Sequence, residues 1–261
     1  MVSGRVSDGA FFGASALLFA VSAAVTVVWC GSMPAMHAMP MPGGWSMSMT
    51  WMRMPGQSWP AAAASFVAMW LVMMIAMMLP MLVPALWRYR QAVVSPTEPR
   101  LGWLTAVMAA GYFFVWTLFG IAVFPLGATL AAVAMQRPPL AHAIPTAAGV
   151  VVLLAGALQF TAWKAHRLAC CRESPRRIDP VRANARTAWR HGLRLGLHCT
   201  CCNAGLTAIL LVTGVMDLRA MAAVTAAMTL ERLVPSGERA ARAIGAIAVG
   251  AGLVLIGRSV W

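Results

Sequence analysis

The sequence predicts an all-α fold, a polytopic transmembrane helical bundle of about seven spans, with six as the alternative count. Of the 261 residues, 61% are hydrophobic and only 10% are charged, whereas soluble domains carry roughly 25% charged residues. The apolar residues form continuous stretches of about 20 residues, the length that a helix needs to cross a bilayer. A membrane β-barrel would instead show segments of about ten residues with alternating polarity. The basic residues, finally, gather in alternate connecting segments.

Seven apolar stretches define the expected spans. The first is read as a retained span rather than a cleaved signal peptide, because its apolar run exceeds the roughly 7–15 residues of a signal sequence. The third can continue through Gly127–Met135, with Pro125 bending or ending it. The sixth is the shortest, at the lower limit for crossing. The expected spans are Ala10–Cys30, Ala61–Trp87, Trp103–Leu126, Ala143–Trp163, Gly192–Val215, Leu218–Val234 and Ala241–Ile256.

The distribution of Lys and Arg predicts the orientation. With the N-terminus in the cytoplasm, 16 of the 20 basic residues fall in cytoplasmic segments, as the positive-inside rule requires. The C-terminus is then periplasmic in a bacterial inner membrane. The net charge of +13 is therefore an orientation signal, and we expect the bilayer as partner and no nucleic acid. We divide the chain into 1–60, the first span with an outer Met-rich loop, and 61–261, the main membrane domain with a cytoplasmic basic loop at 164–194.

The outer loop is unusually rich in thioether sulfur. Residues 33–54 contain eight Met and one His. Thioethers are soft ligands that need no deprotonation, so they suit Cu(I) in an oxidising compartment. The alternative is a Met-rich surface in the headgroup region, anchored by neighbouring Trp residues. The candidate metal ligands here are Met36, His37, Met39, Met41, Met47 and Met49.

A second group of methionines lies in the second span. Met74, Met77, Met78 and Met81 follow helical spacing and share one face. They form either a ladder of thioether sites that leads inward or a stripe for helix packing.

The densest cluster of ligands is His198-Cys199-Thr200-Cys201-Cys202, expected near the cytoplasmic end of the fifth span. Thiols and imidazole are ligands of Cu(I) and, as the less favoured alternative, of Zn(II). On a helix His198, Cys201 and Cys202 share a face, whereas Cys199 points about 100° away. Cys170 and Cys171 lie on the same expected side and could complete the site.

Two ionisable residues in or beside the spans are further candidates, because such residues are rare in membranes and commonly functional. Glu231 lies near the inner end of the sixth span and Asp217 at the outer turn before it. Each can equally form a local ion pair or a helix-end charge.

Five parts of the sequence carry a recognisable combined pattern: Trp70–Pro80, Gly111–Trp116, Ala155–Gln159 with Lys164, His198–Cys202 and Gly214–Met221 through Glu231. Together they resemble the bacterial family of predicted metal-binding integral membrane proteins, over roughly Ala61 to Arg258. The resemblance implies a membrane fold and a metal site. It also implies a C-x-x-C-C motif whose last two cysteines match Cys201 and Cys202 and whose first falls on His198. A family cysteine pair matches Arg167 and Cys171, so only one cysteine is kept there.

These features favour a membrane protein that binds, and in the fuller hypothesis transfers, a soft metal ion, above all Cu(I). Outer methionines would capture the ion and the inner cluster would receive it. The sequence contains no P-loop, dinucleotide fingerprint, nucleophile elbow or HExxH motif, which favours a non-enzymatic role and transfer through a metallochaperone or a membrane complex. A membrane thiol-redox or metal-dependent enzyme, and an accessory or assembly subunit, stay open as alternatives.

Overall fold

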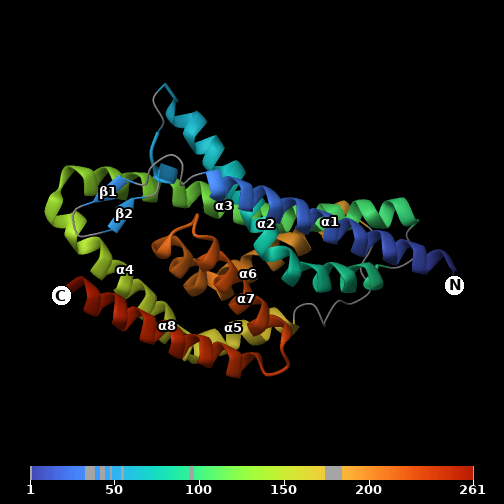
Figure 1. Ribbon diagram of the computed structural model, residues 1–261. Helices are drawn as coiled ribbons and strands as arrows, with labels where there is room; N and C mark the ends of the chain where they lie inside the picture. Colours follow the sequence, from blue (N-terminus) through green and yellow to red (C-terminus); the bar gives the residue numbers. More distant parts are fainter. Residues whose placement is uncertain are drawn as a thin grey trace.

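The protein is a bundle of long helices, shown by a computed structural model (Figure 1). The structure describes residues 2–32, 39–41, 45–47, 49–53, 56–93, 97–173 and 184–260. Met36 and His37 therefore lie outside the described residues. Within the described part the helices are α1 Val2–Ser32, α2 Trp59–Ala92, α3 Glu98–Gln136, α4 Pro138–Leu158, α5 Ala162–Glu173, α6 Ala185–Thr213, α7 Leu218–Leu233 and α8 Gly237–Val260.

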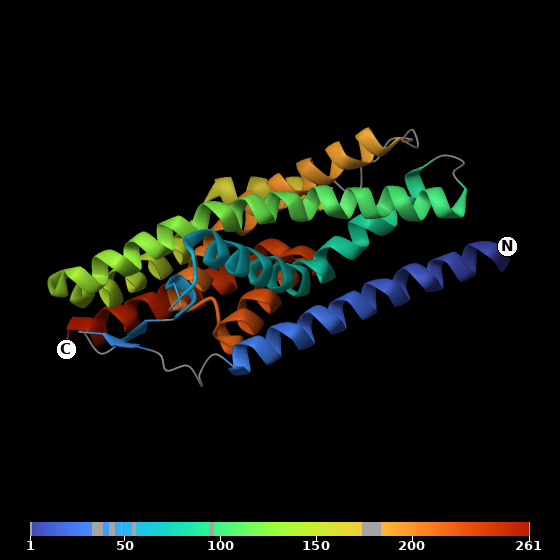
Figure 2. The ribbon, with the colours of Figure 1, turned by 90° about the horizontal axis from the view of Figure 1, so that it is seen from above.

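Six helices in the described part are long and apolar enough to cross a membrane, namely α1, α2, α3, α4, α6 and α8. They suggest a multi-pass membrane protein and confirm the all-α fold class. The α7 helix has 16 residues, about 24 Å at 1.5 Å per residue, which is shorter than a hydrocarbon core of about 30 Å. The two termini lie at opposite ends of the molecule (Figures 1 and 2).

Two expected boundaries were wrong. The fourth span ends at Leu158 rather than Trp163, because the chain turns through Gln159–Thr161. In this turn the Thr161 hydroxyl donates to the Leu158 carbonyl at 2.7 Å and accepts from the Lys164 amide at 3.3 Å, which caps α5. The fifth span begins earlier than expected, since α6 starts at Ala185.

Glycine allows α4 and α8 to pack closely. The α4 and α8 helices run antiparallel, side by side (Figure 1). A Cβ at Gly156 would lie 2.7 Å from the Val249 amide nitrogen, and a Cβ at Gly252 would lie 2.7 Å from the Leu153 amide nitrogen. Neither position can hold a side chain without a backbone shift. Small residues at such contacts are the usual means by which membrane helices approach each other.

The α2 helix lies within the bundle, and its methionines line the core. Six of these side chains are each at most 8% exposed: Met69, Met73, Met74, Met77, Met78 and Met81. Apolar methionines could also face lipid, but these six are buried inside the bundle. The N-terminus of α2 is capped by the Ser58 hydroxyl, which accepts from the Ala61 amide, and Pro60 lies in the first turn.

The described part of the Met-rich linker, which the sequence analysis treated as a loop, forms a small hairpin. Strand β1 (Met39–Met41) pairs antiparallel with β2 (Trp45–Met47), Met39 opposite Met47. Met41 is buried against Ala131, Ala134 and Ala141, and the Trp45 indole donates to the Ala141 carbonyl at 2.9 Å. The hairpin thus packs on the corner between α3 and α4.

Candidate functional site

Cys199 lies at the centre of the buried polar groups. It is residue 15 of the 29 in α6, with a fully buried side chain (0% exposed). Cys202 and Asn203 lie on the same inward face and are 2% and 1% exposed. The neighbouring Cys201 is exposed and His198 is half-buried. The inward face of the cluster therefore carries Cys199 and Cys202, whereas the sequence interpretation grouped His198, Cys201 and Cys202.

Three donors converge on the Cys199 sulfur. The Tyr112 hydroxyl donates to Sγ at 2.9 Å, the Asn203 amide nitrogen at 3.2 Å and the Arg232 guanidinium at 3.5 Å. They come from α3, α6 and α7. Hydrogen bonds to an ionised acceptor, and a nearby cation, favour the charged form. The arrangement suits a thiolate, the form of cysteine that binds metals.

The contact between α3 and α6 brings Tyr112 to Cys199. On α6, Gly192 and Gly196 have the G-x-x-x-G spacing that permits close approach of membrane helices. A Cβ at Gly196 would lie 2.9 Å from the Tyr112 carbonyl oxygen, and one at Gly192 would overlap the Met108 carbonyl. Without side chains at these two positions, the α6 backbone comes close enough for the tyrosine hydroxyl to reach the sulfur.

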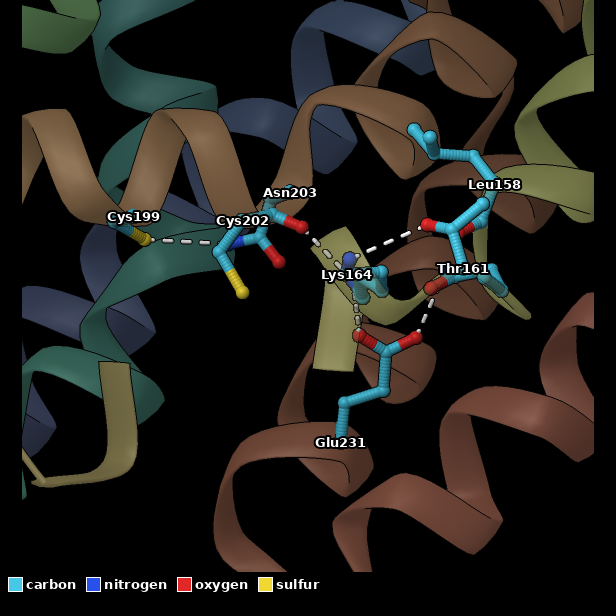
Figure 3. Close-up of polar contacts among 8 residues, drawn as sticks. Leu158, Thr161, Lys164, Cys199, Cys202, Asn203 and Glu231 are labelled. Atoms are coloured by element: carbon cyan, nitrogen blue, oxygen red, sulfur yellow. Dashed lines mark hydrogen bonds and ion pairs between the residues drawn. The ribbon is translucent and has the colours of Figure 1, made fainter. Parts of the chain in front are cut away.

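A buried ion pair lies beside this cluster (Figure 3). Lys164 of α5 and Glu231 of α7 are 2.7 Å apart, with side chains 3% and 1% exposed. Lys164 also donates to the Cys202 carbonyl at 2.8 Å, and Gln159 donates to the Glu231 carboxylate at 3.0 Å. Figure 3 shows Lys164 between Glu231 and the stretch of α6 that holds Cys202 and Asn203. The pair ties α5, α6 and α7 together.

Sulfur side chains run through the same core as Cys199. One contiguous cluster of buried residues contains Cys199 with the six α2 methionines and Met108, Met221 and Met228, and it also contains Cys30. The predicted ligands Met74, Met77 and Met78 belong to it. The core could thus present soft ligands to a soft metal ion.

Other predicted ligands do not meet here. Among the described residues no three His, Cys, Asp or Glu side chains form a group that could hold a metal ion. Cys170 lies 3.6 Å from His166 on the exposed part of α5, and the side chain of Cys171 is outside the described part. Met39, Met47 and Met49 lie in the hairpin and the 3₁₀ turn Met49–Trp51 that follows it. Asp217 caps α7, its carboxylate accepting from the Arg219 amide at 2.7 Å.

Sequence reasoning did not assign several residues of this site. The three donors to Cys199 were not assigned, namely Tyr112, Asn203 and Arg232. Cys199 and Cys202 were predicted as ligands, but their C-x-x-C spacing was not used. A signal was present, since Asn203 is the only amide or charged residue among residues 199–213 of α6, and strongly polar residues within membrane helices are commonly functional. Its partners on other helices could not be named without the fold.

The fold and the site define a helical protein of membrane type with a sulfur-rich core around a hydrogen-bonded thiol. Residues 67–255, well over half of the chain, match the PpoB2 family, described as copper chaperone. The chain belongs to this copper chaperone family, which agrees with the copper assignment made from the sequence. No curated protein and no solved structure matches the chain.

Proposed function

We propose that the protein is a membrane-embedded copper chaperone that holds Cu(I) on sulfur ligands inside its bundle, with Cys199 as the main thiolate ligand. The observation that carries this proposal is the position of Cys199, buried among core methionines and contacted by three donors. Thioethers and thiolates are the ligands that select Cu(I). Membership of the copper chaperone family supports copper as the cargo.

The donors around Cys199 suit a protein that must release its metal. Without copper, the Arg232 guanidinium and the two neutral donors would stabilise a negative charge on the sulfur. A thiolate that the protein already stabilises gains less free energy on binding copper than a thiolate whose charge only the metal neutralises. Its affinity for copper is therefore lower. The ion can then pass to a competing set of thiols by ligand exchange, with no need for a nucleotide.

The order of sites follows from the orientation that the charge distribution predicts. Methionines of the linker would capture copper on the periplasmic side of a bacterial inner membrane, and the α2 methionines would receive it next. Cys199 would hold the ion nearer the cytoplasmic side. A metallochaperone or a membrane complex would be the partner. Zn(II) is the less favoured cargo, because thioether sulfur is a poor ligand for it.

The test is a Cu(I) competition titration of the purified full chain in detergent, against a chromophoric Cu(I) chelator. Cys199→Ser keeps the size of the side chain and removes the soft ligand, so we expect it to bind at least one equivalent fewer than wild type. Cys170→Ser, which removes a thiol on the outside of α5, is the matched control and should titrate like wild type. A Cys199→Ser protein with unchanged stoichiometry and affinity would contradict the proposal.

A membrane thiol-redox enzyme is the second candidate, favoured by the C-x-x-C spacing of Cys199 and Cys202. Attack on a substrate disulfide requires an accessible thiolate, whereas these two side chains are 0% and 2% exposed. Thiol counting by mass spectrometry after incubation with oxidised and reduced glutathione separates the two functions. A reversible loss of two free thiols at Cys199 and Cys202 would favour the enzyme.

A further inference from the structure

The α1 helix docks on the bundle through a narrow stripe that ends in a cysteine. Its buried side chains among residues 8–32 are Ser22, Thr26 and Cys30, spaced four residues apart. The two hydroxyls bond within the helix, Ser22 to the Phe19 carbonyl at 3.0 Å and Thr26 to the Ser22 carbonyl at 2.8 Å. Cys30 instead reaches across to another element. Its sulfur lies 3.7 Å from the sulfur of Met216.

The turn that carries Met216 is held in place from both sides. Gly214 has a φ of 125°, a backbone conformation that favours glycine. The Asp217 amide donates to the Gly214 carbonyl at 3.1 Å, and the Asp217 side chain caps α7. Met216 thus lies in a fixed turn opposite the end of α1, and the two sulfur atoms come from separate elements, 186 positions apart in the chain.

We infer that Cys30 and Met216 form a second Cu(I) site, through which copper is loaded from the Met-rich linker into the core. This inference rests on the proposed function. With metal–sulfur bonds of about 2.3 Å, a sulfur separation of 3.7 Å corresponds to an angle of roughly 107° at the metal. That angle leaves room for further ligands, and residue 33, where the Met-rich linker begins, is three positions after Cys30.

The charge balance of the pair selects a monovalent ion. On binding, the Cys30 thiol loses its proton to water and its sulfur donates an electron pair, whereas the Met216 thioether donates without any proton exchange. One thiolate and one Cu(I) are neutral together, which suits a site where Cys30 is only 6% exposed. Zn(II) or Cu(II) would leave a net positive charge on the two sulfurs, and a thioether is a poorer ligand for either ion than for Cu(I).

The site connects with the sulfur-rich core on its buried side. Cys30 belongs to the same contiguous cluster as Met69, Met221 and the Met73–Met81 group of α2, and Met216 packs against that cluster. A copper ion at Cys30 and Met216 would therefore border the contiguous cluster that also holds the core thioethers and Cys199. The pair lies where the linker meets the bundle, which is the position that a loading site requires.

The experiment is a Cu(I) titration of the full chain in detergent, against a chelator, with parallel titrations using Ag(I) and Zn(II). We expect the double variant Cys30→Ser/Met216→Leu to bind one equivalent of Cu(I) and of Ag(I) fewer than wild type. Met216→Leu alone should weaken that equivalent by at least about tenfold, since even residues that only orient a metal ligand contribute 10–100-fold. Met135→Leu, at an exposed methionine of α3, is the matched control and should leave the binding of Cu(I) and Ag(I) unchanged.

The variants also separate this inference from the proposed function. The Cys199→Ser variant should still bind one Cu(I) at Cys30, and the double variant should still bind one Cu(I) at Cys199. A double variant that binds as many equivalents as wild type, with equal affinity, overturns the loading site while the proposed function stands. A wild-type chain that binds no Cu(I) overturns both. Met216→Leu preserves the size of the side chain, so a wild-type unfolding temperature for this variant shows that a lost equivalent reflects the ligand and not the fold.

Discussion

At the residue scale, Lys164 and Glu231 bring two opposite charges together inside the bundle, 2.7 Å apart and almost fully buried. Removing charges from water costs several kcal/mol for each ion, and close pairing with additional hydrogen bonds offsets this cost. Here the Cys202 carbonyl and the Gln159 amide supply those bonds. The pair joins three helices around the candidate copper ligand, so its loss should affect the site as well as the stability.

Replacing one member of the pair should destabilise the protein strongly. Glu231→Leu leaves the Lys164 ammonium buried without its counter-charge, and we expect a loss of about 3–5 kcal/mol. The double variant Lys164→Met/Glu231→Leu should recover much of this loss because neither charge then remains buried. The measurement is thermal unfolding of the purified protein in detergent, with all variants at the same pH.

The matched control is the exposed pair of Glu238 and Arg242, 3.7 Å apart, with side chains 58% and 65% exposed. Glu238→Gln should change the stability by less than about 1 kcal/mol. If Glu231→Leu were no more destabilising than Glu238→Gln, the buried pair would have no structural role.

The sequence alone predicted the types of residue at the site better than their contacts. The thiol cluster at 198–202 was visible as a dense run of ligands, and helical spacing placed Cys199 away from Cys201. Which face turns inward depends on the α3–α6 contact, since Tyr112 is 87 positions from Cys199. Cys30 likewise had no assignable partner, because Met216 meets it only through the packing of α1 on the bundle.

At the element scale, the α4–α8 pair depends on glycines spaced seven residues apart, Gly149 and Gly156 on α4 and Gly245 and Gly252 on α8. Without a hydrophobic driving force between helices in lipid, close van der Waals contact holds such a pair together. The Gln159 side chain, which contacts Glu231, follows the end of α4, so this packing also positions part of the buried network.

Gly252→Ala should therefore destabilise the bundle, whereas Gly250→Ala should not. At Gly252 the new methyl would lie 2.7 Å from the Leu153 amide nitrogen and 2.9 Å from the Gly149 carbonyl oxygen, and at Gly250 it would meet nothing within 4 Å. We expect a loss of about 1–3 kcal/mol for Gly252→Ala from overpacking. Gly250→Ala, in the same helix, should be neutral or stabilising by up to about 1 kcal/mol. Thermal unfolding in detergent measures both, and equal unfolding temperatures would contradict the close packing.

The sequence predicted helix existence well and helix ends less well. Apolar length gave the spans because a bilayer imposes that length. The break after Leu158 was missed, since Gln159–Thr161 contain neither Gly nor Pro, and a side-chain bond from Thr161 to Leu158 helps to close the turn. The start of α6 was placed too late because its first ten residues include Arg186, Arg190 and Arg194, which a hydropathy criterion excludes although they continue the helix.

At the scale of the whole molecule, the number of passes determines on which side of the membrane each cluster of sulfur ligands lies. The termini lie at opposite ends of the bundle (Figures 1 and 2), as an odd number of passes would place them. Only α7 leaves the count open, because its 16 residues are short for a full crossing. Arg232 lies in the last turn of α7, and Arg239 and Arg242 lie near the start of α8. Basic residues that flank the ends of spans are retained in the cytoplasm.

We therefore expect α7 to count as a pass and the C-terminal end to be periplasmic. Alkaline phosphatase, which folds only in the periplasm, should be active when fused after residue 260 and inactive when fused after residue 173, in the basic segment. A green fluorescent protein fused at the same two positions should give the reverse result. If α7 did not cross, α8 would return the chain to the cytoplasm and the fusion after residue 260 would lack phosphatase activity. In that case Met216 and the loop after α7 would lie on the same side of the membrane.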